Sequence, residues 1–536
     1  MLRLLSGALA LNLLLVAPLW WRFGTFGHPL VAWEAWIIVP LMLILPVGPF
    51  RRLMSVALVS WVALATVANV GDAATHMAFG RPLNLYLDTP LMRSVFHLLV
   101  GNVGQVWAIC AMLAGAALLL GILWALVRLL TPRHTLAANR IKGGVALGLG
   151  VLATCLALGQ LANRLVMPQA ALPMIEATRF QWQQIVTTHR ARLAFAEQLE
   201  TAPLKAQALP GLDERNVLLT FVESYGVSAI NDPRYSDVLL PTLSTMQQRL
   251  DARGLHVVSG LVEAPIRGGQ SWLAHATLLS GRWVDNQLWY RLMLSTQSPT
   301  LIDDFKATGQ RTLSIMPAIT LAWPEGEAYG FDDIVVAKDI DYAGPPLNWV
   351  TMPDQFTLDY TQRHLLGDAP VFAQMALISS HAPWTPILPV IEDWESIGDG
   401  RIFAPWEDAG DPPEVLWQDI ERIRDHYAWS VDYAVKVTGR WAERVVDDNT
   451  LMIMLGDHQP APLITGDEAS AAVPVHIISG DPALLAPFYA HGFVDGTLPN
   501  LDNPERAARM SQLRHWLKEG FGADDLPIRK TPWSSR

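Results

Sequence analysis

Apolar residues in the first part of the chain gather into five long runs separated by short polar segments. Each run is close to the ~20 residues that a helix needs to cross the hydrocarbon core of a bilayer. The runs predict five membrane-spanning helices, at about Leu4–Trp21, Leu30–Phe50, Leu53–Val70, Val106–Leu130 and Val145–Ala162. A simple secreted protein is excluded, because a cleaved signal peptide would account for the first run alone.

Beyond these runs the pattern changes, and short strand-like runs alternate with helix-like segments. Strands are expected at Asn216–Val222, Leu255–Val262, Arg311–Met316, Asp333–Ala337, Val371–Ile378, Leu451–Leu455 and Val473–Ser479. Helices are expected at Leu243–Arg253, Ser298–Thr308, Gln418–Asp447 and Asn503–Glu519. Continuous apolar runs suit strands buried on both faces of a parallel sheet. The alternation predicts an α/β sandwich with a largely parallel sheet.

The two patterns divide the chain into three regions. We expect a transmembrane domain at 1–163, a linker at 164–210 and a water-soluble domain at 211–536. In the linker, Phe180, Trp182 and Ile185 lie among arginines. This mixture predicts an amphipathic helix at the membrane surface. Packing of the same helix on the soluble domain is the alternative interpretation.

Charge indicates which side of the membrane each region occupies. With the N-terminus in the cytoplasm, the inner segments carry seven Lys or Arg and the outer loops three, which follows the positive-inside rule. The inner residues are Arg3, Arg51, Arg52, Arg128, Arg133, Arg140 and Lys142, and the outer ones are Arg22, Arg81 and Arg93. Five spans then place the soluble domain outside. We expect a multi-pass protein of a bacterial inner membrane with its domain in the periplasm or outside the cell.

Composition narrows the classes of function. The chain has 536 residues, a formal net charge of −11 and no run of Lys or Arg, so a nucleic-acid partner is not expected. Its two cysteines, Cys110 and Cys155, both lie in predicted spans. The soluble domain must therefore be stable without disulfides, and a multi-cysteine zinc site is excluded.

Side chains suited to metal binding follow three of the predicted strands. Glu223 comes directly after the first strand, His381 comes after Val371–Ile378, and Asp457-His458 follow Leu451–Leu455. Ligands of open α/β sheets bind just beyond the carboxyl ends of the strands. These side chains should therefore meet along one edge of the sheet, as the outline of a metal site.

A serine completes this constellation. Gly268 and Gly269 form a turn before Ser271, and a helix of about ten residues follows and stops at Gly281. A serine at a helix N-terminus, where free N–H groups favour an anion, is a nucleophile for phosphoryl or sulfuryl transfer when a cation lies beside it. Taken alone, Ser271 would be a simple N-cap.

Together these motifs resemble the sulfatase-like branch of the alkaline phosphatase superfamily. The stretch from Ser271 to Gly281 has the spacing of the sulfatase signature, and it lies between the strand-end Glu223 and a late Gly456-Asp457-His458. With the predicted spans, the chain looks most like the membrane phosphotransferases of that branch. These include lipoteichoic acid synthase, the phosphoglycerol transferases and the phosphoethanolamine transferases.

The resemblance implies a role for each matching residue. Glu223, Ser271, Asp457 and His458 would hold one divalent cation, which is Mn²⁺, Zn²⁺ or Mg²⁺. Ser271 would also be the nucleophile, and His381 would contact the phosphoryl oxygens or protonate the leaving group. Trp323 resembles a tryptophan of the head-group pocket, although the arginine expected after it is missing.

Two further residues are candidate substrate ligands. His275 stands where sulfatases have an active-site arginine, and Arg267 precedes the glycine turn. The alternative interpretations are that His275 is a buried helix residue and that Arg267 is a surface residue. Leu273 and His275 also depart from the signature for oxidation to formylglycine, so an unmodified serine is expected.

The expected function is a metal-dependent phosphotransferase. It would move a phosphoglycerol or phosphoethanolamine head group from a membrane phospholipid to an envelope glycan or lipid. The alternatives are a sulfatase or phosphodiesterase, and a catalytically silent envelope-assembly module.

Overall fold

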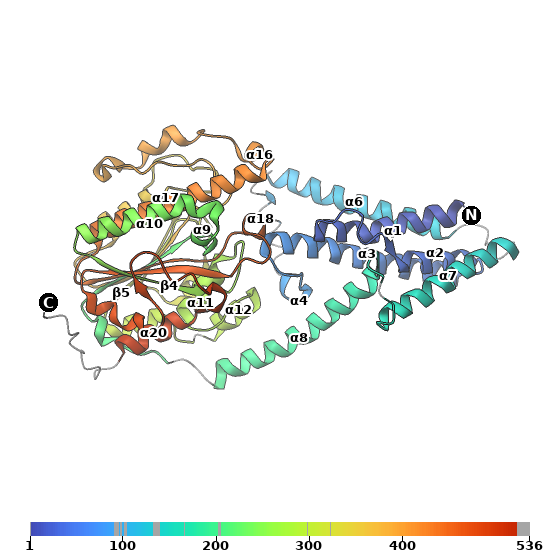
Figure 1. The fold of residues 1–536 in the computed structure, drawn as a ribbon, viewed down its shortest axis with the longest axis horizontal. Helices are drawn as coiled ribbons and strands as arrows, with labels where there is room; N and C mark the ends of the chain where they lie inside the picture. The colour runs from blue at the N-terminus through green and yellow to red at the C-terminus, as the bar shows by residue number, and fades with distance from the viewer. Residues whose placement is uncertain are drawn as a thin grey trace. The chain divides into compact units, whose positions relative to one another are not determined.

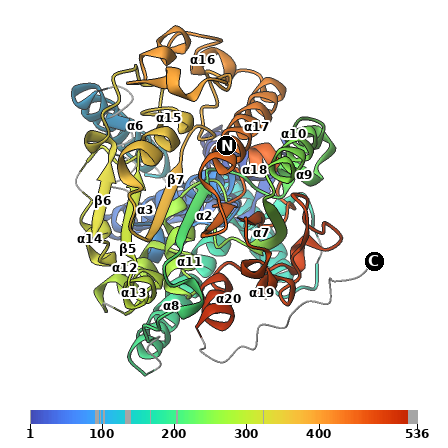
Figure 2. The ribbon, with the colours of Figure 1, turned by 90° about the vertical axis from the view of Figure 1, so that its left-hand side faces the viewer.

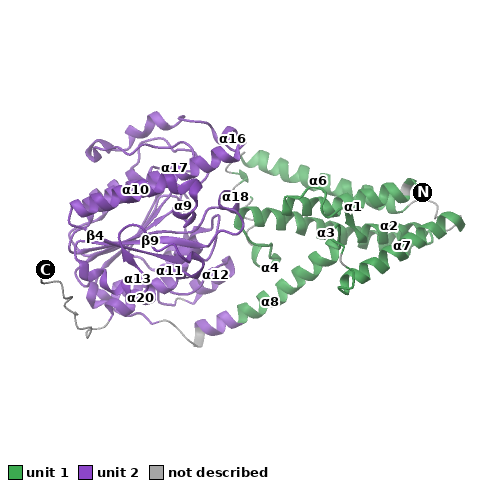
Figure 3. Cartoon of the chain, viewed as in Figure 1, with its two compact units in different colours: residues 1–193 green, residues 194–536 purple. Residues whose placement is uncertain are grey.

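The computed structural model describes residues 2–89, 96, 99–100, 104–131, 140–165, 167–201, 205–296, 298–321 and 323–522. The chain divides into two compact units, residues 1–193 and 194–536, which Figure 3 shows in separate colours. Unit 1 holds the apolar N-terminal helices, and unit 2 holds the α/β domain.

Unit 1 consists of helices and one small parallel sheet. Four helices are long and apolar enough to cross a membrane by length and composition: α1 (Leu2–Phe23), α3 (Pro49–Phe79), α6 (Gln105–Leu130) and α7 (Arg140–Leu161). The other elements are β1 (Val31–Ala32), α2 (Trp33–Ile44), α4 (Leu85–Asp88), β2 (Ala170–Ala171) and α8 (Pro173–Thr201), the last of which continues into unit 2.

The second predicted span differs from the expectation. Its helix α2 has 12 residues, which is about 18 Å of helix against the ~30 Å of a bilayer core. Pro46 and Gly48 follow it in the turn before α3, and Pro49 is the first residue of that next helix. The described residues thus contain four helices that are both long and apolar enough to span a membrane, rather than five. The side of the membrane on which each region lies stays a prediction. It depends on an odd number of membrane crossings and on the charges of Arg93 and Arg133, and these two residues lie outside the described residues.

Unit 2 is built on a nine-stranded mixed sheet, mostly parallel, in the order β10-β4-β9-β8-β3-β7-β5-β6, with β11 beside β4. The strands are β3 (Asn216–Val222), β4 (His256–Glu263), β5 (Arg311–Met316), β6 (Asp333–Val336), β7 (Val371–Leu377), β8 (Thr450–Gly456), β9 (Ala472–Ser479), β10 (Val494–Asp495) and β11 (Ala508–Arg509). β3, β5, β6, β7 and β8 are parallel to their neighbours among these five strands. β9 pairs antiparallel with both β8 and β4.

Helices cover both faces of this sheet (Figures 1 and 2). α10 (Pro233–Ala252) and α17 (Ile420–Val445) pack in the hydrophobic core on one face, and α11 (Ser271–Ser280), α13 (Leu301–Thr308) and α20 (Gln512–Phe521) pack on the other. β3 contributes Leu218 and Val222 to the first core, and Val217, Leu219 and Phe221 to the second. Both faces of the central strand are therefore buried, as its continuous apolar run predicts.

Shorter elements connect these layers. They are η3 (Pro210–Leu212), α9 (Ser228–Asn231), α12 (Gln287–Ser295), α14 (Pro324–Tyr329), η4 (Ala337–Asp339), α15 (Asp354–Tyr360), η5 (Thr361–Leu365), η6 (Trp394–Ile397), η7 (Arg401–Trp406), α16 (Pro413–Leu416), α18 (Pro462–Thr465), η8 (Pro482–Leu484), α19 (Ala486–Tyr489) and η9 (Pro504–Arg506).

The register of the central strands brings the candidate residues to one level. Val222 at the end of β3 pairs with Gly456 of β8 and with Leu377 of β7. The three parallel strands therefore finish together, and the residues that follow them lie at one edge of the sheet.

Candidate metal centre and catalytic serine

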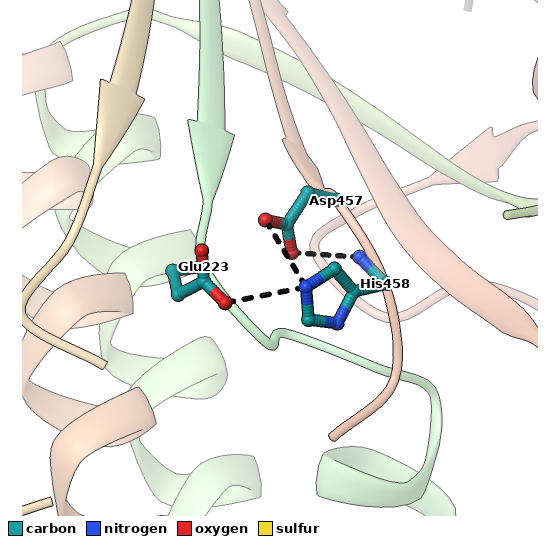
Figure 4. Close-up of side chains that lie close together, drawn as sticks. All are labelled: Glu223, Asp457 and His458. Carbon is teal, nitrogen blue, oxygen red and sulfur yellow. Dashed lines mark hydrogen bonds and ion pairs between the residues drawn. The ribbon is translucent and has the colours of Figure 1, made fainter. Parts of the chain in front are cut away.

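Three of the predicted ligands converge beyond the ends of β3 and β8. One donor atom from each of Glu223, Asp457 and His458 lies within 4.8 Å of the others, and all three side chains are buried (Figure 4). Nε2 of His458 is 3.2 Å from Oε1 of Glu223 and 3.7 Å from Oδ2 of Asp457. The edge that the sequence predicts thus gathers two carboxylates and an imidazole.

Ser271 joins this group as its fourth member. Its hydroxyl donates a hydrogen bond of 3.0 Å to Oε2 of Glu223 and lies 3.1 Å from Nε2 of His458. Ser271 is the first residue of α11, and Gln270 before it has a left-handed backbone with φ of 64°. The hydroxyl therefore stands at a helix N-terminus, where the helix dipole favours an anion.

Backbone contacts fix the position of Ser271 relative to Asp457 and His458. Gly268 donates its N–H to the carbonyl oxygen of Gln459, at 2.9 Å. Gly456 lies so close to the Tyr225 carbonyl oxygen that a Cβ at position 456 would be 1.8 Å from it. The glycine of the Gly-Asp-His motif is therefore required by close packing between the ends of β3 and β8.

Hydrogen bonds orient the donor atoms. Oδ1 of Asp457 accepts the N–H groups of Ser224, at 2.8 Å, and His458, at 2.7 Å. Nδ1 of His458 lies 2.8 Å from the Gln459 carbonyl oxygen, which can only accept a hydrogen bond. Nδ1 therefore carries the proton in the neutral ring, and the lone pair of Nε2 faces Glu223 and Ser271.

The cluster holds two acidic groups and one basic group, and their pKa values are coupled. Burial raises the pKa of Asp457, and the neighbouring Glu223 carboxylate raises it further. Burial also opposes ionisation of Glu223, but the charge of the His458 imidazole outweighs it and lowers the pKa of Glu223. Burial disfavours imidazolium at His458, yet the two carboxylates raise its pKa to about 9. Without a cation the raised pKa lets Asp457 hold a proton, so the ionised Glu223 faces one imidazolium, and a cation at the site would displace these protons.

The donor set fits a divalent cation. Atoms that lie within 4.8 Å of one another can each be ~2–2.5 Å from a central ion. Two carboxylates, an imidazole and a hydroxyl suit Zn²⁺, Mn²⁺ or Mg²⁺. The cation would supply the positive charge that two buried carboxylates require.

His381 lies in the exposed loop after β7, and its charge is among those that lower the pKa of Glu223. Its Nδ1 is 2.5 Å from the Ala382 carbonyl oxygen, so Nε2 is the basic nitrogen of the neutral ring. The indole of Trp349 stacks on the imidazole at 6.4 Å between ring centroids. The loop is tied to the metal centre, because Ser380 donates its hydroxyl to the Glu223 carbonyl oxygen at 2.6 Å.

His275 is buried on α11, one turn after Ser271. Its ring lies 4.1 Å from that of Phe221 between centroids. Burial lowers the pKa of His275 to about 4, although the Glu223 carboxylate raises it in part. A neutral imidazole thus stands where a sulfatase would have an arginine, and its role as a substrate ligand stays a prediction.

The structure does not bring Arg267 and Trp323 into the cluster. Nη1 of Arg267 donates to the Asp467 carbonyl oxygen at 3.1 Å. Trp323 packs against the core, and a Cβ at Gly326 would overlap its ring. Among the described contacts, none joins either side chain to Glu223, Asp457 or His458, and their substrate-binding roles stay predictions.

Three residues that brace the site were missed by the sequence reasoning. The hydroxyl of Tyr427 on α17 donates to the Ser224 carbonyl oxygen at 3.1 Å. The side chain of Gln459 bonds Ser228 at 3.0 Å. Asp354 accepts the N–H groups of Ile378 and Ser379, and burial raises its pKa to about 6. No sequence signal pairs these residues, because the contacts join distant segments.

Comparisons with known proteins find matches at the level of the fold. No family model matches the chain, and neither does any curated protein. The lipoteichoic acid synthase LtaP of Listeria monocytogenes matches with 14% identity over 59% of this chain and 73% of that one, at a TM-score of 0.36. The phosphoglycerol transferase GacH of Streptococcus pyogenes, in complex with sn-glycerol-1-phosphate, matches with 14% identity over 62% and 80%, at 0.38.

A third match is the C-terminal periplasmic domain of EcEptC from Escherichia coli in complex with Zn, with 13% identity over 60% of this chain and 86% of that one, at a TM-score of 0.36. Proteins of the kind that the motifs resemble are thus among the structural matches, at 13% and 14% identity.

Proposed function

We propose that the protein is a metal-dependent phosphotransferase that moves the phosphorylated head group of a membrane phospholipid through a covalent ester on Ser271. The observation that carries the proposal is the position of the Ser271 hydroxyl, 3.0 Å from Glu223 and 3.1 Å from His458 at the start of a helix. An ordinary N-cap serine accepts backbone N–H groups, whereas this hydroxyl belongs to a cluster of metal-ligand type.

Glu223, Ser271, Asp457 and His458 would hold the cation. When bound, it would lower the pKa of the serine hydroxyl and offset charge on the phosphoryl oxygens. Ser271 loses its proton to solvent as the site is loaded, and its oxygen then attacks the phosphorus atom. The bond from phosphorus to the diacylglycerol oxygen breaks, and that oxygen takes a proton from protonated His381.

The second half of the reaction returns Ser271 and His381 to their starting protonation states. Nε2 of His381, now neutral, accepts the proton of an acceptor hydroxyl, whose oxygen attacks the phosphorus atom. The bond to Ser271 breaks, and the serine is again an alkoxide. His381 fits this role because its Nδ1 is engaged with the Ala382 carbonyl oxygen, which leaves Nε2 as its acid and base.

The donor is proposed to be phosphatidylglycerol or phosphatidylethanolamine, and the acceptor an envelope glycan or lipid. The apolar helices of unit 1 support a lipid donor, because a membrane tether raises the effective concentration of a substrate that lies in the bilayer.

The test is release of diacylglycerol from fluorescent phosphatidylglycerol and phosphatidylethanolamine by the purified chain with Mn²⁺, Zn²⁺ or Mg²⁺. We expect metal-dependent release that Ser271→Ala abolishes and that Ser295→Ala, an exposed serine of α12, retains. Intact mass should show a head-group phosphate adduct on Ser271. Cleavage of a soluble aryl sulfate or phosphodiester with no release from either lipid would assign a hydrolase instead.

A further inference from the structure

Two residues beside the site have a left-handed backbone although neither is a glycine. Ser224, directly after Glu223, has a φ of 56°, and Trp384, three residues after His381, has a φ of 58°. Both residues are buried. A left-handed backbone is costly for a residue with a Cβ, and it persists only where neighbouring groups hold it in place. The contacts of these two residues therefore indicate what keeps the parts of the site in position.

Ser224 holds both carboxyl groups of the metal centre. Its N–H donates to Oδ1 of Asp457 at 2.8 Å, and its hydroxyl donates to Oε1 of Glu223 at 3.0 Å. Its carbonyl oxygen accepts the hydroxyl of Tyr427 at 3.1 Å. Tyr427 is fully buried on α17. This hydroxyl thus holds the one residue that contacts both carboxyl groups.

Trp384 holds the segment that carries His381. Its N–H donates to the His381 carbonyl oxygen at 3.3 Å, and its indole Nε1 donates to the Ser380 carbonyl oxygen at 2.8 Å. The hydroxyl of Ser380 in turn donates to the carbonyl oxygen of Glu223 at 2.6 Å. The backbone that carries His381 is therefore bonded to the residue that precedes Ser224.

The side chain of Tyr427 closes these contacts into a network. Its ring meets the ring of Trp384 edge to face, with centroids 5.6 Å apart and planes at 74°. Such pairs attract, because the positive edge of one ring meets the negative face of the other. The Tyr427 network consists of Glu223, Ser224, Ser380, Trp384 and Tyr427, all of which are buried. It joins the turn after β3 to the segment after β7 at two neighbouring carbonyl oxygens.

The distance between these two parts of the chain matters for the proposed reaction. Ser271 is bonded to Glu223 at 3.0 Å, and His381 lies in the segment that Trp384 holds. Both side chains act on the same phosphoryl group, and a misplacement of about 1 Å can cost a factor on the order of 10² in rate. Closed hydrogen-bonded networks can hold their members more firmly than separate bonds do.

A nearby tyrosine shows what an ordinary buried hydroxyl does. Tyr235 lies in the same hydrophobic core, and its ring meets that of Tyr427 with centroids 5.1 Å apart. Its hydroxyl donates to the carbonyl oxygen of Ile464 at 2.6 Å. None of the hydrogen bonds in the described part of the chain joins Ile464 to the metal centre or to His381. The two tyrosines are alike in burial and bonding, and they differ in what the hydroxyl holds.

We propose that Tyr427 is a positioning residue, which holds the His381 segment at a fixed distance from the turn that carries Glu223. Tyr427 is fully buried, so it acts through Ser224 and Trp384 and touches no substrate. The inference rests on the proposed function, since that function makes His381 the acid and base. Loss of the hydroxyl should loosen both parts of the chain together, because the network joins them.

The first test measures this coupling without chemistry. Hydrogen–deuterium exchange of the full-length chain in detergent is followed by mass spectrometry for Tyr427→Phe, which removes only the hydroxyl. We expect about tenfold faster exchange in peptides from both 223–226 and 378–385. Tyr235→Phe is the matched control: it should lower the melting temperature by a similar amount and leave both segments as in the parent. Faster exchange at 223–226 alone, or in both segments of both variants, would overturn the inference.

The second test measures rates on whichever substrate the parent turns over, whether a phospholipid, a soluble phosphodiester or an aryl sulfate. With the cation in excess, Tyr427→Phe should lower kcat by about 10- to 100-fold and change KM by less than about twofold. In a His381→Ala background the same substitution should have almost no further effect, because the residue that it positions is gone. Tyr235→Phe should keep the kcat of the parent.

An equal loss of kcat with and without His381 would contradict the inference, because Tyr427 would then support the fold or the metal centre in general. An unchanged kcat in Tyr427→Phe would contradict it as well. A parent that turns over none of these substrates would contradict the proposed function instead, and the exchange measurement then decides the inference by itself.

Discussion

Unit 2 buries two groups of charged side chains, and the two groups differ in how their charges are balanced. Arg514 of α20 donates to both oxygens of Asp304, at 2.7 and 3.2 Å, and to the carbonyl oxygens of Ser280 and Pro299. Lys518 lies 3.6 Å from the same carboxylate. In this group each carboxylate oxygen faces a cation, so no further ligand is needed.

The Glu223, Asp457 and His458 group has two carboxyl groups and one imidazole, and the raised pKa of Asp457 keeps a proton on the second carboxyl when no cation is bound. Its carboxylates are as deeply buried as Asp304, so the difference is one of charge and not of exposure. A pair that satisfies itself stabilises the fold, whereas a second buried carboxyl that must keep its proton gains from a cation that allows it to ionise. The comparison teaches that charge balance distinguishes a buried structural group from a buried binding site.

The largest effect is expected from Asp457→Asn. This change should remove the metal and lower activity by a factor on the order of 10³ or more. The asparagine can still accept the Ser224 and His458 N–H groups through Oδ1. Since one of two buried carboxylates is gone, the metal-free variant should be at least as stable as the metal-free parent. Denaturant unfolding in EDTA checks this, and a marked loss of stability there would mean that the group is structural.

Arg514→Met is the matched change in the other group. It leaves Asp304 buried and unpaired except for Lys518, which should cost about 3–5 kcal/mol of unfolding free energy. The folded fraction should keep its bound metal, as measured by elemental analysis. A variant as stable as the parent would show that the Asp304–Arg514 pair does not stabilise the fold.

Chelation of the metal should separate the parent from Asp457→Asn. A cation present at 100 times its dissociation constant stabilises the native state by about 2.7 kcal/mol. The melting temperature of the parent should therefore fall in EDTA and recover when the ion is restored, whereas that of Asp457→Asn should not change. A parent that melts at the same temperature with and without EDTA would contradict the metal assignment.

The smallest effect concerns a buried group with no charge. His476 of β9 lies 2.8 Å from Ser259 Oγ and 3.1 Å from the Tyr225 hydroxyl, and burial lowers its pKa to about 4. The unfolded chain, with a histidine pKa near 6.5, takes up the proton first. This contribution to stability is therefore complete above pH 6.5 and is lost as the pH falls towards 4.

Between pH 6.5 and 5.5 the loss for His476 amounts to about 1 kcal/mol. His476→Gln should flatten the pH dependence of the unfolding free energy by that amount, in urea titrations at both pH values. Identical pH dependence in the two proteins would show that the pKa of His476 does not differ between the folded and the unfolded chain.

The sequence predicts some parts of the molecule better than others. All seven expected strands are present, because continuous apolar runs such as Val371–Ile378 indicate a buried strand without any knowledge of its partners. The direction of a strand relative to its neighbours in the sheet is harder to predict. β9 runs antiparallel to β8 and β4, yet its apolar run Val473–Ser479 resembles those of the parallel strands. The expected helix Asn503–Glu519 is helical from Gln512 to Phe521, after the short elements η9 and β11.

The candidate site likewise contains residues that the sequence predicts and residues that it does not. Glu223, Asp457 and His458 were predictable, because each follows a strand and strand ends share an edge. The support from Tyr427 and Asp354 was not, because helix periodicity marks these residues as buried without showing which distant backbone groups they bond. The length of α2 was overestimated, because apolar composition continues through Pro46 and Pro49 while the helix does not.

The register of β3 also bears on how the site is made during synthesis. Ser224 and Asp457 are joined by a hydrogen bond although they are 233 residues apart, and β3 pairs only with strands that come later in the chain. Contacts of such separation form late and slowly in folding. A nascent chain that ends before β8 presents Glu223 without its partners and cannot hold the ion. Loading of the proposed cation would therefore come after β8 has been synthesised, and the ion would be taken from the compartment in which unit 2 folds.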